Sequence, residues 1–334
     1  MKRHKICKII FAILAVFLCV AFYELIGICI TYKKQPAVSD ATIKETQNIM
    51  SVAGRENTER AVIIEKNSQA LLERVRLIQN AKDEIILSTF AFKSDESGKL
   101  ILGALHDAAD RGVHVRILVD GMESWIDMEG NPYFYGLSSH ENVEIKLYNK
   151  ANPLKPWKTM GRMHDKYLIA DGKIYILGGR NTYNYFLGDF PGHKNFDRDV
   201  LVVCDEPQKD NSVNQLWNYF ETIWEQEDCR YFHNSKKLAD RQSVKKAVLE
   251  LQEGYQQYFE VNKEKICDKD YADETFETEK ITLLSNPIHT QAKEPVVWYQ
   301  LGELMKNAKE RVKIHTPYII CNDMMYNTCC LLYT

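Results

Sequence analysis

Met163-His164-Asp165-Lys166-Tyr167-Leu168-Ile169-Ala170-Asp171 is the most informative stretch of this chain, and Gly178-Gly179-Arg180-Asn181 follows it closely. Its histidine and its lysine are two positions apart, so on a β-strand their side chains would share one face. The aspartate that ends the stretch and the glycine after it are typical of a tight turn. The pattern therefore predicts a β-hairpin that presents a histidine and a lysine on the same side.

The side chains on this hairpin suit a phosphate group. Lys166 supplies a compact positive charge, Asn181 supplies amide donors, and His164 supplies a nucleophilic nitrogen. Gly178 and Gly179 remove side chains where a ligand must come close to the backbone. We therefore predict a phosphate site with a reactive histidine. The alternative is an ordinary hairpin with a surface histidine and lysine.

The spacing resembles the signature of the phospholipase D superfamily, which is His-x-Lys, four residues, Asp, six residues, Gly-Gly or Gly-Ser, one residue, Asn. At average residue usage, six fixed positions coincide by chance on the order of once in 10^8 starting points. The matching residues in this chain are His164, Lys166, Asp171, Gly178, Gly179 and Asn181.

This resemblance implies a fold and a mechanism. In that superfamily two similar α/β halves face each other across a pseudo-two-fold axis, and each gives one His-x-Lys-Asp motif to a shared site. One histidine attacks the phosphodiester and becomes a phosphohistidine. The other protonates the leaving alcohol and then activates water or an incoming alcohol. The resemblance implies neither a metal ion nor another cofactor.

The resemblance also implies a role for each residue. His164 would be the nucleophile or the acid, and Asp171 would be the third member of the catalytic motif, with a mainly structural role. Asp199, near the head of the next strand, would be the carboxylate that orients the histidine, with Asp197 as a rival. The predicted phosphate ligands are Lys166, Gly179 and Asn181.

Composition sets broad limits on the protein. A chain of 334 residues is long enough for one large or two medium domains. The formal net charge of -3 is not that of a protein that binds nucleic acid by bulk charge. The nine cysteines show neither metal-ligand spacing nor a disulfide framework.

An apolar run over 9–32, interrupted only by Glu24, is long enough to cross a bilayer as a helix. A secretory signal peptide is the alternative, but no Ala-x-Ala cleavage pattern is visible, which favours an uncleaved single-pass anchor. More lysine and arginine precede the run than follow it. This bias predicts a cytoplasmic N-terminus and an extracytoplasmic body at a bacterial plasma membrane.

The rest of the chain reads as an α/β protein. Apolar strand patterns alternate with helical ones, which indicates a sheet covered by helices, and the resemblance makes this an α/β/α sandwich of phospholipase D type. The expected strands cover 61–64, 84–92, 113–119, 143–148 and 199–204, and the expected helices include 71–78, 98–110 and 215–224.

A second copy of the pattern begins late in the chain. Residues 80–89 recur at 307–316, an offset of 227, and an amphipathic helix precedes each copy. A chance match of two helix-strand pairs is the alternative. At this offset a second His-x-Lys would fall near 391, past Thr334, so we expect one complete half and a second half that is truncated.

These observations predict five segments. They are a membrane anchor at 1–34, a linker at 35–60, a phospholipase D-like domain at 61–235, a charged connector at 236–278 and an incomplete repeat at 279–334.

The functional prediction is a membrane-anchored phosphodiesterase or phosphatidyltransferase of cardiolipin-synthase type, with a phosphatidylglycerol-like phospholipid as substrate. Loss of the second motif would impair it, and a homodimer could complete the site. One alternative is a non-catalytic protein that binds anionic lipid or phosphate. A nuclease is a further alternative, disfavoured because the chain has no basic stripe.

Overall fold

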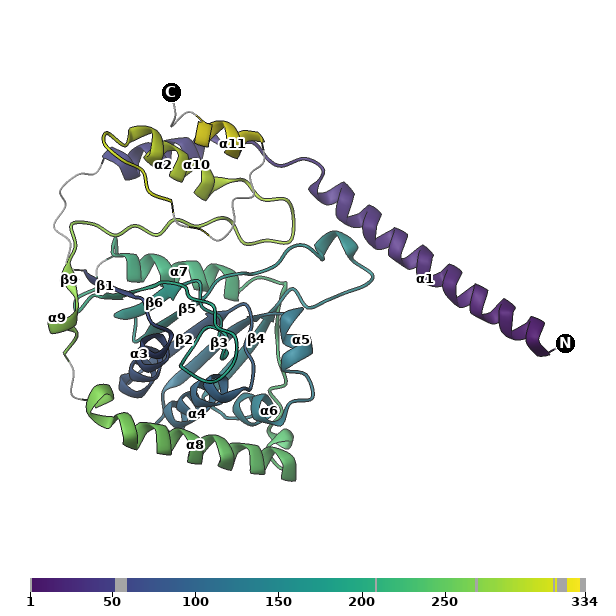
Figure 1. Cartoon of the computed structure of the whole chain (residues 1–334), viewed down its shortest axis with the longest axis horizontal. Coiled ribbons are helices and arrows are strands. Elements are labelled where there is room, and N and C mark those ends of the chain that lie inside the picture. Colours follow the sequence, from purple (N-terminus) through teal and green to yellow (C-terminus); the bar gives the residue numbers. More distant parts are fainter. Residues whose placement is uncertain are drawn as a thin grey trace. The chain divides into compact units, whose positions relative to one another are not determined.

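The computed structural model describes residues 2–51, 59–207, 209–267, 270–314, 316 and 323–330. The chain divides into two compact units. The first, called the sheet unit, comprises Glu56–Ala151 and Arg162–Ile281. The second, called the anchor unit, comprises Met1–Arg55, Asn152–Gly161 and Thr282–Thr334. Figure 1 labels the elements of both units.

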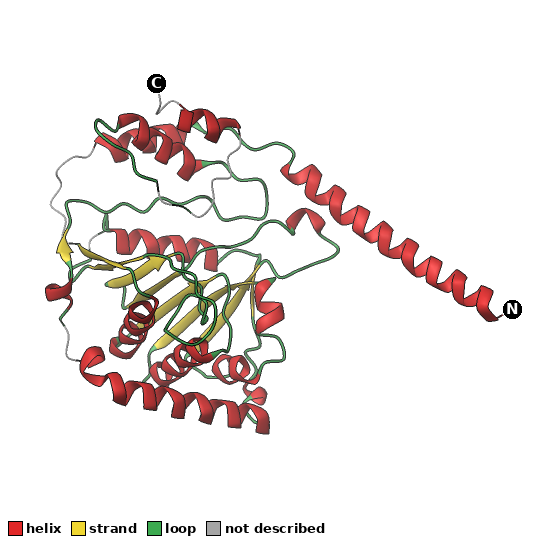
Figure 2. Ribbon diagram, viewed as in Figure 1, coloured by secondary structure: helices red, strands yellow, loops and turns green. Residues whose placement is uncertain are grey.

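The sheet unit is built on one nine-stranded mixed sheet, seen edge-on among its helices in Figure 2. β2, β3 and β4 are parallel neighbours, and every other neighbouring pair is antiparallel. In spatial order the strands are β8 (Cys229–Tyr231), β4 (Val143–Tyr148), β3 (His114–Asp120), β2 (Glu84–Thr89), β5 (Tyr167–Ala170), β6 (Ile174–Gly178), β7 (Asp199–Val203), β1 (Arg60–Ile64) and β9 (Phe276–Glu277).

Helices cover both faces of this sheet, so the predicted α/β/α sandwich is confirmed (Figure 1). Alternate residues of the strands, such as Leu87 and Ile117, are buried in one core with the helices of the first face. That face carries α3 (Asn67–Asn80), α4 (Glu96–Asp110), α6 (Pro132–Ser138) and α8 (Gln242–Cys267), and the other carries α7 (Ser212–Trp224). The remaining short helices of the unit are α5 (Glu123–Asp127), η2 (Lys236–Leu238) and α9 (Tyr271–Glu274).

The long helix α8 lies in the segment predicted as a connector, yet it is part of the sheet unit. A Cβ atom added at Gly103 of α4 would lie 2.6 Å from the backbone oxygen of Leu251, so the two helices pack backbone to backbone. Leu251 and Tyr255 are buried against the same core. Helical spacing of its apolar residues explains this packing, because they form one stripe that the charged residues do not interrupt. The five-segment division stays a prediction.

The predicted hairpin is present, with a shorter first strand than expected. β5 and β6 pair antiparallel, and Asp171 and Gly172 turn the chain with φ of 53° and 61°. Both values lie in the left-handed region that tight hairpin turns need. His164 and Lys166 precede β5 rather than lie on it, although the Lys166 carbonyl still accepts a hydrogen bond of 3.1 Å from the Gly178 amide.

The anchor unit contains α1 (Lys2–Tyr32), α2 (Asp40–Ser51), η1 (Pro156–Lys158), α10 (Val296–Asn307) and α11 (Asp323–Cys330). Residues 4–32 of α1 are long and apolar enough to cross a membrane. Glu294, just before α10, accepts hydrogen bonds from the Ser39 amide at 2.8 Å and the Thr42 hydroxyl at 2.6 Å. These bonds tie the start of α10 to the start of α2.

The predicted second repeat is represented in the structure by its helix, α10. The segments on either side, 281–284 and 311–314, correspond to strand positions of the first copy but have no regular structure in the described residues. A strand needs a neighbouring strand for its backbone N–H and C=O groups, and neither segment belongs to a strand of the sheet in the described residues. His315 of the repeated pattern lies outside the described residues. The repeat itself stays a prediction.

Replacing Asp171 should weaken the sheet unit. Its carboxylate accepts hydrogen bonds from the backbone amides of Lys82, Asp83 and Glu84, at 2.9, 2.8 and 3.0 Å. Asp171→Asn tolerates the left-handed backbone but loses the charge, and should lower the free energy of unfolding by about 1–3 kcal/mol. Denaturant unfolding in detergent measures this. Asp189→Asn, at an exposed loop position, is the control, and equal midpoints for the two variants would contradict the prediction.

Candidate functional site

The motif residues gather at one edge of the sheet because neighbouring strands alternate in direction. β2 ends, β5 begins, β6 ends and β7 begins at this edge. His164 and Lys166 therefore lie close to Phe90, which follows β2. Backbone pairing, rather than any single loop, brings these chain segments together.

His164 and Lys166 lie on the same side of the chain, as the sequence predicts. The His164 ring packs edge-on against Phe90 with centroids 4.6 Å apart. The Lys166 ammonium lies 5.4 Å from the centroid of the same ring. Asp165, the residue between them, points toward α7, where its carboxylate accepts a hydrogen bond of 2.8 Å from the Tyr219 hydroxyl.

Burial tunes both titratable groups of the pair. Burial, and then the positive charge of Lys166, lower the pKa of His164, against the pull of Asp120. The imidazole is therefore neutral, and able to act as a nucleophile, at neutral pH. Burial also lowers the pKa of Lys166 to about 8, although Asp165 and Asp197 oppose the shift. The ammonium donates a hydrogen bond of 2.7 Å to the His164 carbonyl.

Asn181 is oriented by the backbone next to Phe90. Its Oδ1 atom accepts a hydrogen bond of 3.1 Å from the Ala91 amide, and the side chain is buried. Because Oδ1 accepts this bond, the Nδ2 group of Asn181 is the donor that remains. Among the described residues, no hydrogen bond is made by this Nδ2 group, which leaves it suited to a phosphate oxygen.

The two glycines make room for carboxylates. A Cβ atom added at Gly178 would lie 2.0 Å from Oδ1 of Asp199, and one at Gly179 would lie 2.0 Å from Oδ2 of Asp197. The sequence predicted that this space admits a ligand to the backbone. The structure fills it with side chains of the chain itself, and the role of Gly179 as a phosphate ligand stays a prediction.

Asp199 has different partners from those that the sequence predicted. Its buried carboxylate forms ion pairs with Arg74 at 2.9 Å and Arg180 at 3.2 Å. Arg180 also donates hydrogen bonds to the Asn67 side chain and to the backbone oxygen of Asp197. Two guanidiniums thus neutralise the carboxylate that was expected to orient His164. Arg74 belongs to α3, far along the chain, and the role of Asp199 in orienting His164 stays a prediction.

Asp197, the other candidate for the carboxylate that orients His164, acts on Lys166 instead of joining the ion pairs of Asp199. Its carboxylate adjoins Gly179 and acts electrostatically on Lys166, whose pKa it raises. The run Asp197-Arg198-Asp199 therefore splits into one carboxylate near the motif lysine and one in a buried ion cluster.

Asp171 lies away from the other motif residues. β5 runs between it and the histidine, so Asp171 sits at the opposite edge of the sheet, bound to the turn before β2. Four strand residues thus separate Asp171 from His164 and Lys166, and its assignment to the catalytic motif stays a prediction. Its expected structural role agrees with its backbone bonds.

The sequence analysis missed the residue that fixes the start of the motif. Asp120, at the end of β3, is fully buried. It accepts hydrogen bonds from the Arg162 guanidinium at 2.7 and 2.9 Å and from the Met163 amide at 3.1 Å. These bonds hold the two residues just before His164. A polar residue at the end of a buried strand was the signal that could have revealed it.

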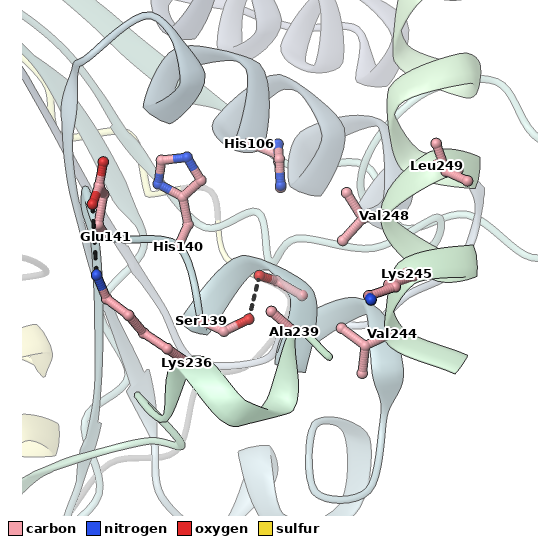
Figure 3. Close-up of a pocket in the computed structure, with 11 residues that line it drawn as sticks. His106, Ser139, His140, Glu141, Lys236, Ala239, Val244, Lys245, Val248 and Leu249 are labelled. Carbon is pink, nitrogen blue, oxygen red and sulfur yellow. Dashed lines mark hydrogen bonds and ion pairs between the residues drawn. The ribbon is translucent and has the colours of Figure 1, made fainter. Parts of the chain in front are cut away.

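A cavity lies elsewhere, at the edge where the parallel strands begin. It has a volume of about 580 Å³ and lies among α4, α6, η2 and α8. Figure 3 shows His106 and His140 on one side and Val244, Val248 and Leu249 of α8 on the other. No motif residue lines it. In the part of the chain that the structure describes, no group of three or more His, Cys, Asp or Glu residues is arranged to hold a metal ion.

The fold and the placement of the pattern define a class of α/β proteins with a histidine–lysine pair at one edge of a mixed sheet. Residues 75–224 match the family described as "Cardiolipin synthase, PLD-like domain", so this part of the chain is a phospholipase D-like, cardiolipin synthase-like domain. The match includes every predicted site residue.

Curated relatives extend the similarity. An uncharacterized protein of Helicobacter pylori (strain ATCC 700392 / 26695) is 27% identical over 298 residues, which cover 80% of this chain and 56% of that protein. Cardiolipin synthase C of Escherichia coli (strain K12) is 29% identical over 154 residues, 42% of this chain and 31% of that protein. The chain thus spans about half the length of the first of these relatives, and less of the second.

Solved structures with a similar fold include NucT from Helicobacter pylori, at 17% identity and a TM-score of 0.40, over 52% of this chain and 99% of that one. Phosphatidylserine synthase of Haemophilus influenzae Rd KW20 aligns at 14% identity and a TM-score of 0.45, over 65% of this chain and 48% of that one.

Asp199→Asn should destabilise the sheet unit severely. It leaves the buried guanidiniums of Arg74 and Arg180 without a countercharge, which costs about 3–5 kcal/mol when one member of a buried pair is removed. Denaturant unfolding in detergent measures the loss. Asp197→Asn is the matched control, because this carboxylate is only half-buried. A smaller loss for Asp199→Asn than for Asp197→Asn would show that the ion cluster does not hold the strands.

Proposed function

We propose that this protein cleaves or transfers a phosphodiester group of a membrane phospholipid through a covalent phosphohistidine at His164. The observation that supports this most is the grouping of a neutral imidazole, a buried ammonium and an oriented amide at one sheet edge. Each of the three has a separate part in binding or attacking a phosphate.

The proposed first step is an in-line attack. A ring nitrogen of His164 bonds to phosphorus as the bond from phosphorus to the leaving oxygen breaks. That oxygen leaves with a proton from a general acid. Lys166 offsets the negative charge of the phosphoryl oxygens, and Asn181 donates a hydrogen bond to one of them. In the second step, water or an alcohol attacks phosphorus, loses its proton to the same acid–base group and releases the histidine.

The proposed mechanism needs a general acid in addition to His164. The His-x-Lys-Asp pattern occurs once in these 334 residues. A general acid contributes roughly 10^2 to 10^4 in rate. We propose that the motif histidine of a second copy of the chain supplies it in a homodimer. Without such a partner, the site would bind phosphate and react slowly.

A phospholipid is the substrate class that the rest of the chain favours. α1 is long and apolar enough to hold the protein at a membrane, and a relative over part of the chain is named cardiolipin synthase. We propose a phosphatidylglycerol-like lipid as substrate, with the body of the protein outside the cytoplasm of a bacterial cell. The second candidate, favoured by the single motif, is an anchored protein that binds anionic headgroups without turnover.

His164→Ala should abolish turnover of phosphatidylglycerol in detergent micelles, with a loss of at least about 10^3. His193→Ala, which removes an exposed histidine of the same unit, is the control. Acid-labile phosphate on the wild-type protein after a quench, missing in His164→Ala, would identify the intermediate. Equal residual rates in wild type and His164→Ala would reject catalysis. Phosphate that still stabilises the wild-type fold, but not that of Lys166→Ala, would then favour the binding protein.

The pH profile should report both members of the pair. Activity should fall as pH rises through about 8, because Lys166 loses the charge that binds phosphate. Lys166→Arg should move that limb upward, because a guanidinium stays protonated. The acidic limb should lie below pH 6.5, since the pKa of His164 is lowered. Initial rates across the pH range test this, and an unchanged basic limb in Lys166→Arg would contradict it.

A further inference from the structure

The loop over 152–161 exposes apolar side chains that no globular packing requires. Leu154 is 78% exposed, Trp157 41% and Met160 57%. Lys155 is exposed as well, and Lys158 is partly exposed. Lysine and tryptophan among aliphatic side chains are typical of segments at the boundary between water and lipid.

This loop is seated on α1, and both belong to the anchor unit. Pro156 is buried, and a Cβ atom added at Gly27 would lie 2.5 Å from its Cγ. The Tyr23 hydroxyl donates a hydrogen bond of 3.2 Å to the Leu154 carbonyl. At the other end, a Cβ atom at Gly161 would lie 2.5 Å from Cα of Thr290. The loop is thus fixed on the C-terminal part of the apolar helix.

The seat lies at the depth of a bilayer boundary. With a rise of 1.5 Å per residue, Tyr23 lies about 21 Å and Gly27 about 27 Å along α1 from Ile9, where the apolar run begins. The hydrocarbon core of a bilayer is about 30 Å thick. A helix that crosses it from Ile9 therefore carries the loop into the outer part of the far leaflet.

The backbone of the loop is suited to that depth. Five of its amide groups bond within the loop, and its two prolines have no amide proton. The Lys155 amide bonds to Asn152, Lys158 to Lys155, Thr159 to Pro156 and Gly161 to Lys158. The Leu154 amide bonds to the Asn152 side chain at 3.0 Å. Backbone polar groups satisfied in this way are what irregular structure needs near hydrocarbon.

We propose that the loop over 152–161 is a second membrane contact, which inserts Leu154, Trp157 and Met160 into the leaflet reached by the C-terminal end of α1. The two lysines extend to the headgroups, where they favour anionic lipid. We infer that the bilayer covers this surface, because the loop packs on a helix that is itself long enough to cross a bilayer.

Insertion of the loop would also keep His164 close to the membrane. Only this consequence rests on the proposed function. His164 follows Met160 by four residues, so their Cα atoms lie within about 14 Å even in an extended chain. A histidine tethered so closely to the boundary can reach the phosphate of a lipid that stays in its leaflet.

Tryptophan quenching in the full chain tests the insertion without any activity assay. The protein is reconstituted in phosphatidylcholine vesicles with a minor fraction of phosphatidylglycerol. The vesicles also contain lipids that carry a spin label, which quenches tryptophan fluorescence, either near the headgroup or near the end of the acyl chain. α1 contains no tryptophan. Trp157→Phe should reduce quenching by the shallow label by about twofold or more, because interfacial tryptophan lies close to it. Trp125→Phe, which removes a tryptophan 63% exposed on α5, is the matched control and should leave it unchanged.

Other outcomes would overturn the proposal. Shallow quenching as strong in Trp157→Phe as in wild type would place Trp157 outside the leaflet. Trp157 emission that iodide in the aqueous phase quenches, and lipid labels do not, would show a solvent-exposed loop. Emission protected from both quenchers would mean that protein, such as a second copy of the chain, covers the loop. Loss of activity with intact shallow quenching would count against the proposed function and leave the insertion standing.

Discussion

The alternating direction of four neighbouring strands is the constraint on which the site depends. β2, β5, β6 and β7 are joined by antiparallel ladders, so the chain segments that meet at one edge come from positions far apart in sequence. The pairing of Ser88 with Tyr167 fixes which residues precede β5 at that edge. A slip of one residue would turn His164 and Lys166 to the face of α7 and bring Asp165 to the motif side.

Buried charges give two similar aspartates different roles. Asp199 and Asp197 are two positions apart, yet Arg74 and Arg180 surround the first, and the second acts on Lys166. The ion cluster ties α3 to β7 at the edge that carries the motif. Because charges are costly to bury unpaired, the cluster resists rearrangement, and the neighbouring glycines must stay small. Lys166 lies outside this ion cluster, and burial is the main cause of its lowered pKa.

The anchor unit supports the proposal of a membrane substrate, because it combines a helix able to cross a bilayer with an apolar loop packed on that helix. The connection from Met160 to His164 is short, so their Cα atoms lie within about 14 Å. Asp120 holds the end of this connection by binding Arg162 and the Met163 backbone, so the histidine enters β5 from a fixed start.

Sequence by itself determined the fold class, the apolar N-terminal helix, the hairpin with its left-handed turn, and the pairing of His164 with Lys166. These follow from local rules: side-chain periodicity, glycine and aspartate in turns, and the length of an apolar run. Tertiary structure alone decided the partners of Asp199, the packing of α8, the distance of Asp171 from the motif and the seat of the loop over 152–161. Each of these depends on a residue distant in sequence, such as Arg74 or Gly27, and the chain's local pattern carries no information on which distant group will arrive.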